Sequence, residues 1–120
     1  MAHNFKKLHI WNRSMDLADQ IFIYCQDLPK SERFNLIDQI NRSSCSIPSN
    51  IAEGSGKRSN LQFGEYLSIS LSSSYELETQ LLICKRRKYG NDALLDQLLK
   101  DLEVLQKMNF SYRNKILNEK

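Results

Sequence analysis

The stretch Ile40–Ser59, INRSSCSIPSNIAEGSGKRS, decides how the chain folds because it carries Pro48 inside a helical pattern. The apolar repeat around the proline has the three-and-four spacing of a packed helix: Ile37, Ile40, Ser44, Ile47 and Ile51. Because this repeat keeps its phase across Pro48, we expect one helix kinked at the proline. The hydroxyls of Ser43, Ser44 and Ser46 are candidates to satisfy the backbone groups that the proline frees.

The ends of this second helix have their own signals. Ser31 is a good N-cap, and Glu32 suits the first turn of a helix. Gly54 and Gly56 tolerate left-handed backbone geometry, and they predict the end of the helix.

The first helix, expected over residues 10–28, carries two apolar seams of the same spacing. One seam is Trp11, Met15, Ala18, Phe22 and Cys25, and the second is Leu17, Ile21, Tyr24 and Leu28. A single seam would suffice for a helix of a monomeric bundle. Two seams indicate a wide intramolecular groove or another subunit. Pro29 stops this helix.

Two more helices follow the central stretch. Ser59 or Asn60 is expected to cap the third, which ends near Tyr89 with the seam Phe63, Leu67, Ser70, Ser74, Leu77, Leu81 and Cys84. Gly90 and Asn91 form a turn. The fourth helix, over residues 92–117, has Leu95, Leu98, Leu102, Leu105 and Tyr112 in phase.

Four helices with short links predict an all-α fold, an antiparallel up-down-up-down four-helix bundle. Residues 1–120 form a single domain, in which residues 1–9 are a frayed N-terminal arm. In this topology Ala18, Ser44 and Ser74 share one level, where Leu102 and Leu105 fill a narrow waist.

Composition narrows the class of protein. The chain has 120 residues, a net charge of +3, and no apolar run near the roughly 20 residues that span a membrane. With no signal peptide at its start, it is expected to be cytoplasmic, with no membrane partner. Cys25, Cys45 and Cys84 are far apart and lie on apolar stripes, so we expect small buried side chains and no disulfide or metal.

The central stretch resembles a known family. Gln39, Ile40, Arg42 and the run Ser46–Gly54, SIPSNIAEG, are similar to the signature of four-helix-bundle proteins encoded in intervening sequences of bacterial 23S rRNA genes. Further matches lie along nearly the whole chain: Trp11, Leu17, Leu28-Pro29, Glu32, Phe34, Arg58-Ser59, Phe63, Leu67, Ser74, Glu76, Leu77 and Glu78. The resemblance implies a homopentameric, barrel-like ring. Relatives include the accessory protein of diversity-generating retroelements, which works beside a reverse transcriptase.

No constellation for catalysis is present, so we expect a protein that is not an enzyme and has no cofactor. The two histidines, His3 and His9, lie in or beside the N-terminal arm and away from any cysteine motif. Ser46 and Ser49 lack the glycines of a nucleophile elbow.

Basic residues suggest contact with RNA or DNA. Lys85, Arg86, Arg87 and Lys88 end the third helix, at the same end of the predicted bundle as Lys30 and Arg33. Lys57 and Arg58 lie at the other end, with Lys6, Lys7, Arg113, Lys115 and Lys120. A ring would repeat these clusters around each mouth and bind phosphates in a salt-dependent way. The alternative is that the Lys85–Lys88 run only complements the helix dipole. Few aromatic residues are available for stacking on bases.

The signature residues have a functional and a structural interpretation. Asn50 and Glu53 either line a functional surface or pore, or bond backbone groups at the kink, the helix end or a subunit contact. Arg42 lies 11 residues before Glu53, too far for a direct pair within one helix, so its partner would lie across an interface. Ser46, Pro48 and Gly54 complete this set.

A different class of function is pure interaction. In this alternative the ring is a scaffold or adaptor for a protein partner, such as a reverse transcriptase, and does not touch nucleic acid. The second seam of the first helix would supply the surface.

Overall fold

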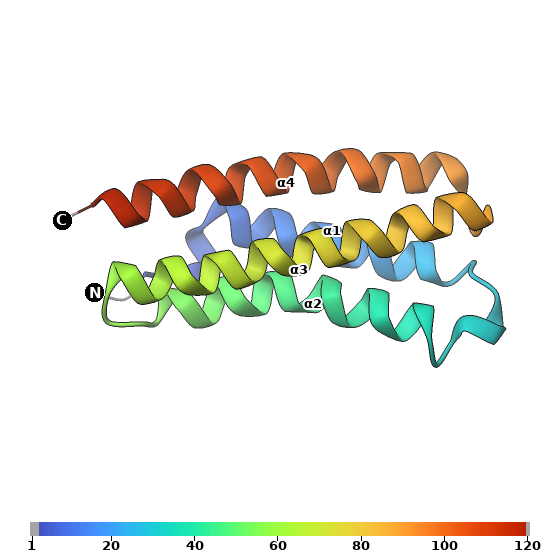
Figure 1. The fold of residues 1–120 in the computed structure, drawn as a ribbon, viewed down its shortest axis with the longest axis horizontal. Helices are drawn as coiled ribbons and strands as arrows, with labels where there is room; N and C mark the ends of the chain where they lie inside the picture. The colour runs from blue at the N-terminus through green and yellow to red at the C-terminus, as the bar shows by residue number, and fades with distance from the viewer. Residues whose placement is uncertain (1–2, 120) are drawn as a thin grey trace.

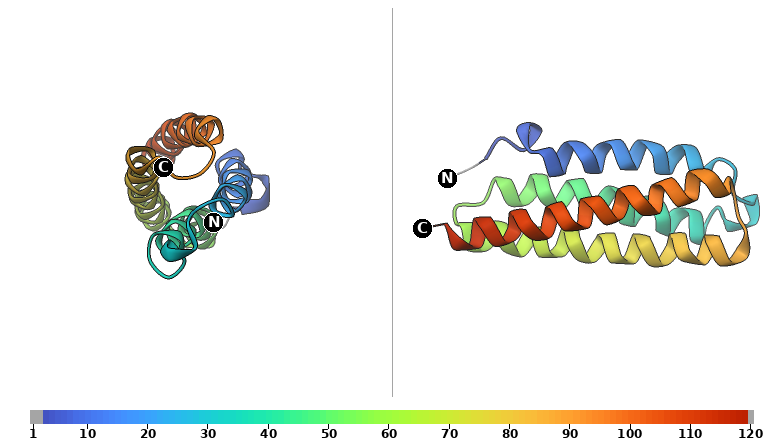
Figure 2. Two further views of the ribbon diagram at one scale, coloured as in Figure 1. Left: turned by 90° about the vertical axis from the view of Figure 1, so that its right-hand side faces the viewer. Right: turned by 90° about the horizontal axis from the view of Figure 1, so that it is seen from above.

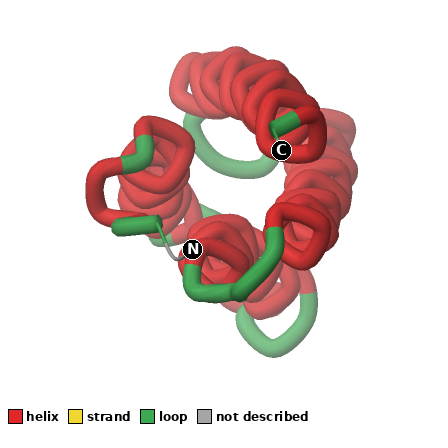
Figure 3. Tube along the Cα trace, turned by 90° about the vertical axis from the view of Figure 1, so that its left-hand side faces the viewer, coloured by secondary structure: helices red, strands yellow, loops and turns green. Residues whose placement is uncertain are grey.

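The chain forms one elongated bundle of helices in a computed structural model that describes residues 3–119 (Figure 1). The elements in order are η1 (Phe5–Lys7), α1 (His9–Cys25), η2 (Lys30–Glu32), α2 (Leu36–Ser55), α3 (Asn60–Arg87) and α4 (Asp92–Asn118), where η marks a short 3-10 turn. Successive α-helices run in opposite directions, which confirms the predicted up-down-up-down arrangement. Viewed along the axis, the helices surround a common centre, and each contacts its two neighbours (Figures 2 and 3).

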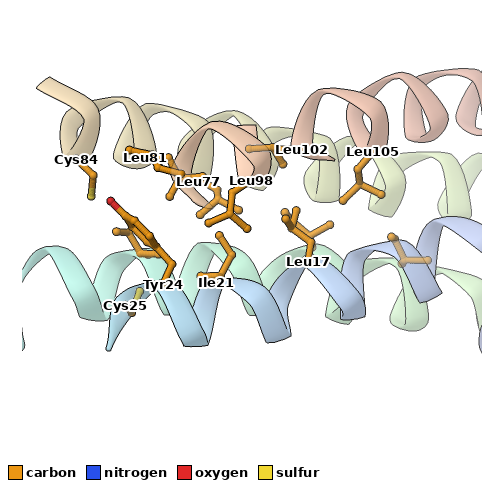
Figure 4. Close-up of a cluster of buried hydrophobic side chains, with 14 of the residues drawn as sticks. Leu17, Ile21, Tyr24, Cys25, Leu77, Leu81, Cys84, Leu98, Leu102 and Leu105 are labelled. Carbon is orange, nitrogen blue, oxygen red and sulfur yellow. The ribbon is translucent and has the colours of Figure 1, made fainter. Parts of the chain in front are cut away.

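The core is a single cluster to which all four α-helices contribute. Figure 4 shows Leu17, Ile21 and Tyr24 of α1 facing leucines of α3 and α4. The seam predicted for the third helix is buried along its whole length: Phe63, Leu67, Ser70, Ser74, Leu77, Leu81 and Cys84. Periodicity therefore located the inner face of α3 correctly, serines included.

The two seams of α1 face different surroundings. Leu17, Ile21, Tyr24 and Leu28 make up the inner seam and are all buried. In the other seam, Met15 is 40% exposed and Phe22 is 53% exposed. The expectation that the second seam would supply a docking surface is therefore wrong. Met15 and Phe22 of the first seam face outward because the second seam turns towards α3 and α4, whereas Cys25 is buried and Trp11 packs against the core.

Helix α2 begins later than predicted. Ser31 is not its N-cap, since residues 30–33 close as the turn η2, with the Arg33 amide donating to the Lys30 carbonyl at 3.1 Å. The helix starts at Leu36, which is buried, and its N-cap Asn35 makes no side-chain capping bond. The residues after Pro29 therefore form a 3-10 turn, and α2 does not start at Ser31.

The end of α2 also differs from the prediction. Gly54 lies inside the helix, and Gly56 has a φ of −87°, so neither uses left-handed geometry. A Cβ added to Gly54 would lie only 2.5 Å from the Cβ of Tyr66 on α3. Glycine is needed at position 54 because two helices approach closely there.

The helix α2 continues through Pro48 without a break. The neighbouring hydroxyls have other partners than the carbonyl that the proline frees. Ser43 Oγ donates to the Ile40 carbonyl and to Gln80 Oε1, and Ser46 Oγ bonds Ser73 Oγ at 2.9 Å. These serines join α2 to α3.

Two local expectations are corrected. The described part of the N-terminal arm is not frayed, because the His3 amide donates to the Ser55 carbonyl at 2.8 Å and the His3 ring lies 5.1 Å from that of Phe63. Cys25 and Cys84 are buried as predicted, whereas Cys45 is exposed. Its place on α2 lies just outside the buried stripe.

Candidate nucleic-acid interface

The basic end of the bundle consists of the connection between α1 and α2 and of the last turn of α3 with the loop that follows it. We call this surface the basic end; its members are the exposed cations Lys30, Arg33, Arg86, Arg87 and Lys88. Tyr89 Oη donates to Glu32 Oε2 at 3.1 Å, which ties the α3–α4 loop to η2. Two segments far apart in the sequence therefore present their cations at the same end of the molecule (Figure 1).

A buried tyrosine of α1 holds the loop at this end in place. Tyr24 is fully buried, and its hydroxyl donates to the Tyr89 carbonyl at 2.7 Å. Gly90, with a φ of 73°, packs directly against the Tyr24 ring, where a Cβ would come within 2.7 Å of Cε1. Burial, more than any neighbouring group, raises the pKa of Tyr24, so its hydroxyl stays a donor. The loop between α3 and α4, which directly follows the basic end of α3, is thereby fixed to the core.

Lys85 differs from the rest of its run. Its Nζ lies 2.8 Å from both Asp92 Oδ1 and Asp96 Oδ1 on α4. The hydrogen bond to Asp92, followed by that to Asp96, raises the pKa of Lys85 above its ordinary value. Lys85 therefore joins the end of α3 to the start of α4, while Arg86, Arg87 and Lys88 point to solvent without an ion pair among the described residues.

One aromatic residue at the basic end was missed by the sequence reasoning. Phe34 is 88% exposed, and the Arg33 guanidinium lies 5.1 Å from its ring centroid. A fully presented ring beside a cation is the pairing that stacks on unpaired bases. The helical repeat could have predicted this exposure. Phe34 lies six residues before Ile40, a spacing that does not fit the apolar seam of α2.

The remaining two predicted cations lie at the opposite end of the bundle, where the turn between α2 and α3 lies. Lys57 Nζ lies 5.0 Å from the centroid of the Tyr66 ring, and Arg58 is exposed. The structure therefore divides the eight predicted residues between two ends and does not bring them into one site.

Other kinds of site find little support in the described chain. Between residues 3 and 119 no three His, Cys, Asp or Glu side chains gather in a way that could hold a metal ion. None of the helices of this part is both long and apolar enough to cross a membrane.

The bundle and its central signature agree with a family model. The model of the 23S rRNA-intervening sequence protein family matches residues 6–111. The chain belongs to this family. A solved structure of similar fold is a protein with unknown function from the S23 ribosomal protein family of Bacteroides thetaiotaomicron, with a TM-score of 0.80 and 26% identity over 87% of this chain and 97% of that one. No curated protein matches the chain.

Several family signature residues lie where α2 meets α3. Asn50 Nδ2 donates to the Ser46 carbonyl at 2.8 Å and to Ser46 Oγ at 2.9 Å, and Ser46 bonds Ser73 of α3. Pro48 and Gly54 are buried in the same helix. These contacts favour the structural interpretation of Asn50.

Arg42 and Glu53 are signature residues of another kind. Both are exposed, and neither side chain has a hydrogen bond or ion pair within the part of the chain that the structure describes. Their separation of 11 residues puts them on nearly the same face of α2, about 16 Å apart along the axis. This face presents a cation and an anion at a fixed spacing.

Proposed function

We propose that this family member is a non-enzymatic subunit of a homo-oligomeric ring, a pentamer, that binds the backbone of nucleic acid through its basic ends. The observation that carries the proposal is the basic end itself. Five exposed cations lie on two segments, residues 30–33 around η2 and residues 86–88 at the end of α3, and a hydrogen bond from Tyr89 to Glu32 and a buried tyrosine hold these segments in place. Cations that form no ion pair can release condensed counterions when they meet phosphates.

Phe34 favours a single-stranded or looped nucleic acid. Stacking of a base on an exposed aromatic ring contributes about 1–3 kcal/mol and tolerates any base. Because the ring lies beside Arg33, one base could stack while its phosphate meets the cations. Binding of this kind would have weak sequence preference.

Assembly into a ring would use surfaces that the single chain leaves uncovered. The outward side of α1 exposes Met15 and Phe22, and α2 presents Arg42 and Glu53, whose side chains have no hydrogen bond or ion pair within residues 3–119. Light scattering tests this part of the proposal. We expect the mass of an oligomer, and a monomer at micromolar concentration would contradict it.

The second candidate is a scaffold ring that binds a protein partner, such as a reverse transcriptase, without touching nucleic acid. The exposed apolar seam of α1 favours it, since aromatic and methionine side chains are enriched at protein interfaces. In this case the cations would serve solubility.

Binding to labelled random-sequence RNA and DNA, followed by fluorescence anisotropy, separates the two candidates. With about six phosphate contacts the affinity should fall on the order of 10³-fold between 50 and 200 mM salt. RNA or DNA in single strands should bind more tightly than duplex, and Phe34→Ala should reduce this difference. Absence of binding at low salt would leave the scaffold as the function.

A further inference from the structure

A groove between α1 and α4 lies at the end of the bundle that carries the described termini, opposite the basic end. It has a volume of about 560 Å³, within the range of about 300–1,000 Å³ that small-molecule sites occupy. Its apolar lining comes from Leu8, Ile10, Met108 and Tyr112. No loop connects α1 directly to α4, so the two helices can diverge here.

The ionisable side chains that line this groove are all basic or, in Tyr112, ordinarily neutral. Lys7 and His9 lie on the α1 side, and Lys107 and Lys115 lie on α4. Lys107 Nζ pairs with Glu103 at 3.2 Å, but both side chains are largely exposed, so the pair can rearrange at little cost. An apolar floor with a cationic rim is complementary to a ligand that has an apolar body and an anionic head.

Two further features orient such a ligand. Helix α1 starts at His9 with Leu8 as its N-cap, and no side chain caps its first amides, so the positive end of its dipole lies at the groove. The next hollow between α1 and α4 is lined by two carboxylates, Asp16 and Asp101, and one guanidinium, Arg13, which leaves it with one net negative charge. An anionic head is therefore favoured at the lysine end and disfavoured towards the middle of the bundle.

We propose that this groove binds a small amphipathic anion of the fatty-acid class. The carboxylate lies near Lys7 and Lys115, and the alkyl chain lies along Leu8, Ile10 and Met108. The site uses none of the five cations of the basic end and lies at the opposite end of the bundle, where the second predicted cluster of cations, which includes Lys7 and Lys115, also lies.

Isothermal titration calorimetry with three ligands of equal chain length tests the charge requirement. Decanoate, decanol and decyltrimethylammonium are used below their aggregation concentrations. We expect decanoate to bind most tightly and the cation to bind least. Equal binding of decanoate and decanol, or no binding of either, would overturn the proposal.

Two double variants with the same loss of charge test the position of the head. Lys7→Gln/Lys115→Gln should weaken decanoate binding roughly ten-fold, since it removes two cations whose attraction to the carboxylate is weakened by their exposure to water. Lys6→Gln/Lys100→Gln changes cations outside the groove and should leave the affinity unchanged. Similar losses in both variants would contradict the assignment.

Two other occupants give different results. If a second copy of the chain fills the groove, decanoate does not bind, and the Lys7→Gln/Lys115→Gln variant loses mass in light scattering. If an acidic helical peptide is the occupant, the peptide binds and decanoate does not. Either result overturns the fatty-acid proposal and leaves nucleic-acid binding to be judged by its own titration.

Discussion

The α2–α3 contact and the α1–α4 contact are built on the same helical periodicity, but the first is close along its length and the second opens at one end. Between α2 and α3 several facing residues are small, and hydroxyls bridge the helices: Ser46 bonds Ser73, Ser43 bonds Gln80, and Ser70 Oγ donates to the Ile47 carbonyl at 2.9 Å. Between α1 and α4 larger side chains meet, and one end of the contact opens into the groove beside Leu8 and Met108. Small polar residues therefore line the close contact of α2 and α3, whereas the contact of α1 and α4 opens at one end beside larger apolar side chains.

The largest effect at neutral pH should follow from filling the close approach of α2 and α3. In Gly54→Ala the new Cβ would lie 2.5 Å from Tyr66 Cβ and 3.0 Å from a Phe63 ring atom, so the helices must separate. We expect a loss of about 2–3 kcal/mol in the free energy of unfolding, measured by urea denaturation.

Gly56→Ala is the matched control, because its Cβ would meet only the Glu53 carbonyl at an ordinary 3.6 Å. Its stability should stay close to that of the wild type. If Gly54→Ala also keeps the wild-type stability, α2 and α3 do not approach each other as closely as described.

Alkaline pH should weaken the packing around Cys25, the last residue of α1. Burial is the main cause that raises the pKa of the Cys25 thiol from about 9 to about 12, and the nearby Cys84 is the second cause. Because the folded state keeps a proton that the unfolded chain releases, this stability is complete below pH 9 and is lost as pH rises towards 12. The loss should be about 1.4 kcal/mol per pH unit.

Urea denaturation across this pH range measures the loss. Cys25→Ala should make the dependence less steep without abolishing it, because burial also raises the pKa of Tyr24 and Cys84, while Cys45→Ala, which removes an exposed thiol, should leave it unchanged. An identical slope in Cys25→Ala would show that the thiol does not contribute.

A smaller effect is expected from one hydroxyl of the closed interface. Ser70→Ala removes the bond to the Ile47 carbonyl and the acceptor of Asn109 Nδ2, which lies 3.3 Å away. The free energy of unfolding should fall by about 1 kcal/mol. Ser72→Ala, at an exposed position of the same helix, should change the free energy of unfolding little. Equal losses in the Ser70 and Ser72 variants would contradict the bridging role of Ser70.

The smallest effect should come from the open side. Met108 is only partly buried, so Met108→Ala should cost less than about 1 kcal/mol, below the 2–5 kcal/mol typical of a buried site. Leu102→Ala, one and a half turns earlier and fully buried, provides the comparison. Equal losses in the two variants would mean that the groove is not open in solution.

Periodicity predicted the four helices and most of the inner faces, because burial follows the helical repeat. It could not choose between the two seams of α1, since Trp11, Met15 and Phe22 are as apolar as the residues that are buried. It also missed the turn η2, where local bonds after Pro29 win over the capping tendency of Ser31. At the candidate interface, sequence placed the cations at the correct ends, but the double ion pair of Lys85 depends on how α3 and α4 meet.

The central claim, that Arg86 and Arg87 meet phosphates, is tested most directly by the slope of log affinity against log salt. Arg86→Gln/Arg87→Gln removes two exposed charges of the basic end, and Arg13→Gln/Lys100→Gln removes two from the middle of the bundle. With single-stranded RNA, we expect the first variant to lower the magnitude of the slope by roughly 1.4, about 0.7 per lost contact, while the second keeps the wild-type slope. Equal slopes in all three proteins would contradict the account.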